Sequence, residues 1–208
     1  MKNPQQQTLG RLFAAVALSF FIAPALQATA NTQQAIFAGG CFWCMEPPFD
    51  ALDGVLSTTS GYIGGTVPEP TYKQVSSGST GHTEALKIVY DPEKISYEKL
   101  LDTFWKNIDP VDQGGQFCDR GSQYRSEVFY TNEQQRKLAE KSKQQLNGGD
   151  VLPSPVQTAI TVASQFYPAE SYHQNYYQKN PKRYKFYSWN CGRKQRLLQL
   201  WGKAYDQR

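Results

Sequence analysis

The chain has little of several residue types that build common kinds of site. It has only four cysteines and two histidines in 208 residues, and so few cysteines cannot build a fold held together mainly by disulfides at this length. Its formal net charge is +4 and it has no dense cluster of Lys and Arg, which argues against nucleic-acid binding. It has no internal repeat and no low-complexity tract. The spacing of the four cysteines must therefore show whether they do chemistry.

The composition is that of a folded globular protein. Hydrophobic residues make up 39% of the chain and aromatic residues 13%, with thirteen tyrosines, far more core-forming residues than a disordered chain carries. Domains most often have roughly 100–200 residues. The length therefore predicts one domain with a sizeable core rather than two large domains.

The first thirty residues have the pattern of a secretory signal peptide. Lys2 and Arg11 precede an apolar run at 12–26, and a small-x-small sequence, Ala-Thr-Ala, ends at Ala30. The run is shorter than the roughly 20 apolar residues of a spanning helix. We therefore expect cleavage after Ala30 and an exported protein, in the periplasm, without stable membrane association after cleavage. The alternative is an uncleaved membrane anchor.

The mature chain, 31–208, alternates strand and helix patterns. We expect strands at 34–38, 84–90, 126–130 and 158–163, and helices at 42–52, 96–108, 132–147 and 193–204. Pro47 and Pro48 fit the first turn of a helix, which predicts that the first helix begins near Cys44. Residues 61–83 are rich in Gly and Pro and predict a loop. The expected fold class is α/β, as an α+β two-layer sandwich with a mixed sheet packed by helices and a long irregular C-terminal segment.

Cys41 and Cys44 form a C-x-x-C motif at a predicted strand-to-helix junction. Unpaired backbone N–H groups at a helix N-terminus can stabilise a thiolate, which makes Cys41 the candidate nucleophile. Zinc is the weakest interpretation, because Cys118 and Cys191 do not form a second closely spaced pair and neither histidine completes one. A thioredoxin-type dithiol, a nucleophile with a resolving neighbour, and two inert structural disulfides stay open.

The two aromatic residues inside the motif favour a small apolar substrate. Phe42 and Trp43, next to a reactive sulfur, offer a wall that could hold a methyl or thioether group. Methionine sulfoxide has an apolar methyl group, an electrophilic sulfur and a polar oxygen. Its reduction needs a nucleophile and an acid that protonates the oxygen.

Five stretches of the sequence resemble the A-type peptide methionine sulfoxide reductases. They occur in the order of that family and span nearly all of the mature chain: GCFWCME at 40–46, GYIGG at 61–65, PTY at 70–72, SGSTGHTEA at 77–85 and DRGSQYRS at 119–126. The resemblance implies a compact α/β sandwich with the nucleophile at a helix N-terminus. It also implies reduction of the S epimer of methionine sulfoxide, free or in damaged proteins, with no metal or organic cofactor.

By this resemblance, Cys41 is the nucleophile that becomes a sulfenic acid. Glu84 corresponds to the family's acid on the sulfoxide oxygen, which requires a pKa raised by partial burial. Tyr72 and Tyr124 correspond to two tyrosines that donate hydrogen bonds to the same oxygen. Asp119 matches a position near the substrate and the thiol. Phe42 and Trp43 would hold the substrate methyl group.

The sulfenic acid must then be resolved by a second thiol. Cys44 is the nearest candidate, and the family also has members with a C-terminal resolving cysteine, which makes Cys191 an alternative and Cys118 a weaker one. A thioredoxin-like dithiol protein would reduce the final disulfide. Nothing in the sequence suggests more than a monomer.

Other functional classes stay as alternatives to a sulfoxide reductase. An exported thiol-disulfide oxidoreductase would use the same C-x-x-C motif, and a non-catalytic domain would use the cysteines as structural disulfides. A Cys-His hydrolase built on His82 or His173 is disfavoured, because the flanking sequence matches a different family.

Overall fold

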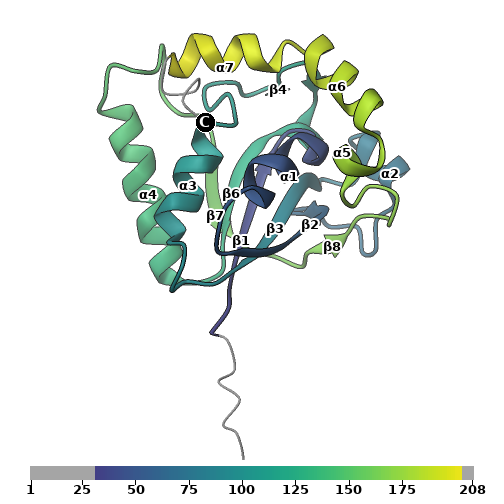
Figure 1. Ribbon diagram of the computed structural model, residues 1–208, viewed down its shortest axis with the longest axis horizontal. Helices are drawn as coiled ribbons and strands as arrows, with labels where there is room; N and C mark the ends of the chain where they lie inside the picture. Colours follow the sequence, from purple (N-terminus) through teal and green to yellow (C-terminus); the bar gives the residue numbers. More distant parts are fainter. Residues whose placement is uncertain (1–30, 203–208) are drawn as a thin grey trace, which may run out of the picture.

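The computed structural model describes residues 31–202, which form one mixed sheet surrounded by helices (Figure 1). The six strands of the sheet lie in the order β7-β6-β1-β3-β2-β8. Only β6 and β7 pair in parallel, and the other neighbours are antiparallel. The strands are β1 (Gln33–Gly39), β2 (Val55–Ile63), β3 (Thr83–Tyr90), β6 (Ser126–Tyr130), β7 (Ala159–Val162) and β8 (Tyr167–Pro168), and a separate pair is formed by β4 (Gly115–Gln116) and β5 (Asp119–Arg120). The predicted α/β class and mixed sheet are confirmed.

Helices pack on the sheet and along its edges (Figure 1). They are α1 (Phe42–Asp50), α2 (Tyr72–Ser76), α3 (Tyr97–Trp105), α4 (Glu133–Asn147), α5 (Tyr176–Lys179), α6 (Pro181–Asn190) and α7 (Arg193–Trp201), with a 3₁₀ turn at Ser122–Tyr124. Helix α3 begins at the N-cap Ser96 and α4 at the N-cap Asn132, each with a side chain that accepts a backbone N–H of the first turn. Both helices match the predicted periodic segments.

Alternating residues of β1 face two unequal hydrophobic clusters. Ala35 and Phe37 face the main core with α1, α3 and α7, and the Phe37 ring stacks on Phe104 with centroids 4.9 Å apart. Ile36 and Ala38 face the smaller cluster on the other side of the sheet. Because both faces of β1 are covered, its sequence is a continuous apolar run rather than an alternating pattern.

The predicted loop at 61–83 is wrong at its start and in its middle. Residues 61–63 complete β2, which lies between β3 and β8, and Tyr72–Ser76 form α2. Gly61 serves packing rather than a turn, since a Cβ there would come within 2.3 Å of the Phe166 ring. Gly61 therefore does not mark a loop but allows the Phe166 ring to pack closely against the sheet.

Helix α1 begins at Phe42, two residues earlier than the prolines predict. Pro47 and Pro48 lie inside the helix instead of in its first turn. Their missing N–H groups leave the carbonyls of Trp43 and Cys44 without the usual helical donor. Tertiary contacts fix the start instead, because the Phe42 N–H donates to the Glu84 carboxyl at 3.1 Å.

The expectation of a long irregular C-terminal segment is wrong. The structure adds α5 and α6 before the predicted last helix, α7. Helix α6 has no buried residue, so it shows no apolar stripe for a periodicity argument to detect. Pro181 occupies its first turn, a position that suits proline.

The predicted signal peptide, residues 1–30, lies outside the described residues. Within 31–202, no helix is long and apolar enough to cross a membrane.

Candidate active site

Cys41 occupies the junction between β1 and α1. The chain turns at Gly40, whose φ of +79° suits glycine, and Cys41 is then the N-cap residue of α1. Cys44 lies one turn further on, and its N–H donates to the Cys41 carbonyl at 3.0 Å. Both side chains are free thiols and both are only 6% exposed. The predicted strand, turn and helix therefore present the two thiols together.

The two thiols have pKa values that differ in direction. Burial raises the pKa of Cys41 well above its usual value, and a hydrogen bond with Cys44 and the neighbouring Glu84 add to this rise. The same hydrogen bond from Cys41 lowers the pKa of Cys44, with Arg193 acting in the same direction and burial against it. Burial of Cys41 therefore opposes the stabilisation of a thiolate that its position at a helix N-terminus suggests.

Glu84 is a buried carboxylic acid at the N-terminus of α1. It lies on β3, is 2% exposed, and accepts the Phe42 N–H at 3.1 Å. Burial raises its pKa to about 8, despite that hydrogen bond. The predicted rise of the Glu84 pKa is confirmed, and the burial that causes it is nearly complete rather than partial.

Tyr72, Tyr124 and Asp119 gather around Cys41 and Glu84. Burial raises the pKa of Tyr72 to about 12 and that of Tyr124 well above its usual value, and the charge of Glu84 adds to both rises. Neither hydroxyl has a hydrogen-bond partner among residues 31–202, which leaves both able to donate to a ligand. Burial also raises the pKa of Asp119. All five predicted residues thus share one site.

Phe42 and Trp43 project to different parts of this site. Phe42 is 1% exposed and packs against Tyr62. The Trp43 indole is half-buried and stacks on Tyr176 with centroids 3.7 Å apart, and its N–H donates to His173 Nδ1 at 3.0 Å. Both aromatic side chains are therefore held rigidly next to Cys41.

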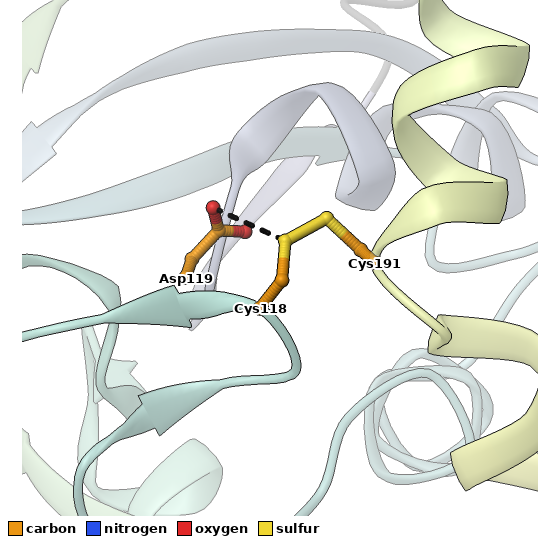
Figure 2. Close-up of side chains that lie close together, drawn as sticks. All are labelled: Cys118, Asp119 and Cys191. Carbon is orange, nitrogen blue, oxygen red and sulfur yellow. Dashed lines mark hydrogen bonds between the residues drawn. A yellow bond between two sulfur atoms is a disulfide. The ribbon is translucent and has the colours of Figure 1, made fainter.

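Cys118 and Cys191 form a disulfide beside Asp119 (Figure 2). Cys118 lies in the turn between β4 and β5, Cys191 caps the end of α6, and 73 residues separate them in sequence. The Cys118 sulfur is 3.8 Å from Asp119 Oδ1. The three side chains are close enough to share a metal ion, but two sulfurs joined in a disulfide are poor ligands compared with thiolates. The sequence did not predict this pair.

A comparison with known families decides what kind of protein carries this site. Residues 33–205 match the sequence model of the family described as peptide methionine sulfoxide reductase. The chain belongs to this family. The reductase is 51% identical over 173 residues to peptide methionine sulfoxide reductase MsrA of Bacillus licheniformis, which covers 83% of this chain and 96% of the relative. It is 50% identical over 168 residues to MsrA of Bacillus subtilis, which covers 81% and 95%.

Solved structures of the family agree with the fold of the reductase. The reduced form of Mxr1 from Saccharomyces cerevisiae has a TM-score of 0.66 and 34% identity, over 74% of this chain and 88% of that chain. Methionine sulfoxide reductase A of Corynebacterium diphtheriae has a TM-score of 0.66 and 31% identity, over 75% and 78%. The predicted family and oxidoreductase class are confirmed.

The two histidines of the reductase have different surroundings. His82 uses both ring nitrogens on backbone groups of the loop, accepting from the Gly65 N–H at 3.0 Å and contacting the Val67 carbonyl at 2.8 Å. His173 is 1% exposed and lies among aromatic rings, 4.3 Å from the centroid of Tyr72. Burial lowers its pKa, so the ring is neutral. Its Nδ1 accepts from Trp43, which places the hydrogen on Nε2.

Sequence reasoning missed two polar residues of the site. The Tyr187 hydroxyl on α6 donates to Asp119 Oδ2, and its ring meets Trp43 edge-on with centroids 5.8 Å apart. Arg193 at the start of α7 is 7% exposed, donates to the Asn107 carbonyl and lies 3.6 Å from the Met45 sulfur. Neither lies in a recognisable motif, because each reaches the site from a helix more than 140 residues beyond Cys41. Only their aromatic and basic character was visible in the sequence.

Proposed function

We propose that this reductase converts the S epimer of methionine sulfoxide, free or in proteins, to methionine, with Cys41 as the nucleophile. The observation that carries the proposal is the pairing of a buried thiol with a buried carboxylic acid at one helix N-terminus. Glu84, with a pKa of about 8, keeps its proton at neutral pH. A neutral acid can donate that proton to a sulfoxide oxygen, which an ionised carboxylate cannot.

The reaction balances with these groups alone. The Cys41 sulfur attacks the sulfoxide sulfur and Glu84 protonates its oxygen, while Tyr72 and Tyr124 donate hydrogen bonds to that oxygen. The thiol proton of Cys41 restores Glu84. The S–O bond of the substrate and the transient bond between the two sulfurs then break as the hydroxyl group passes to the Cys41 sulfur. The products are methionine and a sulfenic acid on Cys41, so the substrate sulfur is reduced by two electrons and the Cys41 sulfur is oxidised by two.

We assign the resolving step to Cys44. Its thiol attacks the sulfenic acid, which releases water and joins Cys41 and Cys44 in a disulfide. The free state of both thiols and their mutual hydrogen bond support this assignment. The nearby Arg193 favours the thiolate form of Cys44, the form that attacks. The alternative resolver, Cys191, is already bonded to Cys118.

We infer in addition which kind of protein reduces the enzyme after turnover and in which compartment the enzyme acts. A thioredoxin-like dithiol protein would restore the thiols, because the cycle consumes two electrons per methionine. The basic, apolar and small-residue pattern of residues 1–30 supports export to the periplasm with cleavage after Ala30. The enzyme would act there as a monomer.

The test is an activity assay of the mature chain with each methionine sulfoxide epimer and dithiothreitol. We expect turnover of the S epimer alone and no turnover in Cys41→Ser. Reduction of insulin disulfides without sulfoxide turnover would instead support the alternative, an exported thiol-disulfide oxidoreductase. Inactivity in both assays would support a non-catalytic domain.

A further inference from the structure

Three side chains with potential metal-ligand atoms meet where the β4–β5 hairpin approaches the end of α6 (Figure 2). They are Cys118, Asp119 and Cys191, and their ligand atoms lie within 4.8 Å of one another. Among residues 31–202, they are the one group of three Cys, His, Asp or Glu side chains with ligand atoms this close together. Two sulfurs and one carboxylate oxygen are a donor set that zinc accepts, once both sulfurs are thiolates.

The hairpin that carries two of these side chains is anchored to the C-terminal helices. Strands β4 and β5 pair on either side of a two-residue turn at 117–118. The Phe117 ring projects from this turn and lies 4.4 Å from the Arg193 guanidinium, a cation–π contact. Arg193 begins α7, directly after the end of α6. The contact therefore holds the hairpin beside the segment that carries the third side chain.

The Asp119 carboxylate is oriented by a hydrogen bond from α6. The Tyr187 hydroxyl donates to Asp119 Oδ2, and Asp119 Oδ1 lies 3.8 Å from the Cys118 sulfur. A hydrogen bond to one carboxylate oxygen is the usual way in which proteins orient a metal-ligating carboxylate. Neither this bond nor the contact of Phe117 with Arg193 involves the disulfide. Both therefore keep the three side chains together after the disulfide is reduced.

Reduction of the disulfide allows the ligand atoms to reach the separation that zinc needs. With Zn–S bonds of about 2.3 Å and a Zn–O bond of about 2.0 Å, tetrahedral ligand atoms lie about 3.5–3.8 Å apart. The Cys118 sulfur and Asp119 Oδ1 are already at 3.8 Å. The Cα atoms of Cys118 and Cys191 are 4.8 Å apart, which is close enough for both side chains to reach one ion.

The charges around these side chains favour Zn²⁺ over other thiol-binding ions. Burial raises the pKa of Asp119, while the hydrogen bond from Tyr187 and the charge of Arg193 act against that rise. Two thiolates and one carboxylate carry one negative charge more than Zn²⁺ neutralises, and the nearby Arg193 offsets it. Cu(I) selects soft sulfur ligands, whereas zinc also binds carboxylate oxygen.

We propose that the reduced Cys118–Cys191 pair and Asp119 form a redox-gated zinc site, with a fourth position open to solvent. The disulfide first takes two electrons and two protons from a dithiol or a phosphine, which breaks the S–S bond and gives two thiols. Each thiol then loses its proton as its sulfur binds the ion. A small-molecule disulfide can oxidise the two thiolates again, which forms the S–S bond and releases the ion. Metal binding here goes beyond the proposed sulfoxide reduction and does not depend on it.

Metal binding is measured in a background without the inner thiols, Cys41→Ser combined with Cys44→Ser. The probe is Co²⁺, whose thiolate complexes absorb strongly and which Zn²⁺ then displaces. After reduction with a phosphine and its removal without air, we expect about one ion per chain, and none in unreduced protein. Absence of binding by reduced protein with a folded circular dichroism spectrum would overturn the proposal. Binding that persists when Cys118 and Cys191 are also serine would overturn it too.

Substitutions of single polar side chains test the third ligand in the same background. We expect the Kd for Zn²⁺ to rise about 100-fold in Asp119→Asn and about tenfold in Tyr187→Phe, which removes the orienting hydroxyl. The matched control is Asp112→Asn, which removes a carboxylate that pairs with Arg120 of the same hairpin at 2.6 Å, and its Kd should change little. An unchanged Kd in Asp119→Asn would overturn the three-ligand site.

The wild-type chain gives a second readout that needs no substitution. In the reduced protein, bound Zn²⁺ should slow alkylation of Cys118 and Cys191 by iodoacetamide at least about tenfold, because a coordinated thiolate is a poorer nucleophile. The buried Cys41 and Cys44 should react at the same rate with and without Zn²⁺, as peptide mapping can show. Protection of Cys41 and Cys44 instead would place the ion at the inner thiols and overturn the proposal.

Discussion

The two cysteine pairs of this reductase are built in opposite ways. Cys41 and Cys44 are three residues apart, buried, and free thiols. Cys118 and Cys191 are 73 residues apart, lie toward the surface, and form a disulfide. The inner pair lies in a site with an acid and two hydroxyl donors, whereas the outer pair lies next to exposed aromatic and basic side chains.

The difference in burial gives the two cysteine pairs different access to water and to other proteins. The inner pair is shielded from water, and burial of the neighbouring Glu84 raises the pKa of that carboxyl to about 8. The outer pair, in contrast, has an exposed residue, Cys118. The comparison predicts that variants of the inner pair and of the outer pair fail at different steps.

The largest expected effect is that of Cys44→Ser. The variant should still release one methionine per enzyme, because Cys41 and Glu84 remain, but recycling by thioredoxin should fall at least about 200-fold without the inner disulfide. The measurement compares single-turnover methionine release with steady-state turnover. If recycling survives, Cys191 is the resolver and the division between the pairs is wrong.

Glu84→Gln tests the acid beside the inner pair. We expect kcat to fall about 100-fold, with little change in substrate binding, because the amide cannot donate a carboxylic proton. In the wild-type enzyme, Glu84 is protonated below its pKa of about 8, so the rate of methionine release should fall as pH rises through that value. An unchanged kcat in the variant would remove Glu84 from its role.

Replacing both outer cysteines by serine tests their contribution to stability. The disulfide closes a long loop, so we expect the free energy of unfolding in urea to fall by about 2–4 kcal/mol. Wild-type enzyme treated with dithiothreitol should unfold like the untreated variant, and the variant should not respond to dithiothreitol. Equal stability of all samples would show that the outer pair adds nothing to the fold.

The smallest expected effect is that of Arg193→Met. Loss of the buried cation should raise the pKa of the Cys44 thiol and slow formation of the inner disulfide at pH 7 about five- to tenfold. The deficit should shrink as pH rises, since more of Cys44 then becomes thiolate. The titratable and charged groups that interact with Cys44 are Cys41, Glu84, Asp119, Tyr184, Tyr187 and Arg193.

Two variants serve as controls for that experiment. Arg193→Lys keeps the positive charge and should retain most of the rate. Arg196→Met removes an arginine from the same helix that pairs with Asp109 at 2.6 Å and does not interact with Cys44. A slower rate in Arg196→Met, or a deficit in Arg193→Met that does not change with pH, would show a packing effect of α7 instead.

Local sequence was sufficient for much of the fold. Strand β1, the turn at Gly40 and helices α3 and α4 follow from apolar runs, glycine and caps within a few residues. Local sequence was insufficient where tertiary packing overrode the conformational preference of single glycine or proline residues. Gly61 lies in a strand because the Phe166 ring needs its space, and the prolines of α1 lie inside a helix whose start Glu84 fixes.

The sequence by itself determined the family and the C-x-x-C motif, and it predicted Cys41 and the four residues that gather around it, because these depend on residue types in short motifs. Only the tertiary structure decided the Cys118–Cys191 disulfide, the placement of Arg193 and Tyr187, and the direction of the Cys41 pKa. Burial and pairing between distant segments depend on how the whole chain packs. A short motif places a thiol at a helix N-terminus, but it cannot say how much water reaches that thiol.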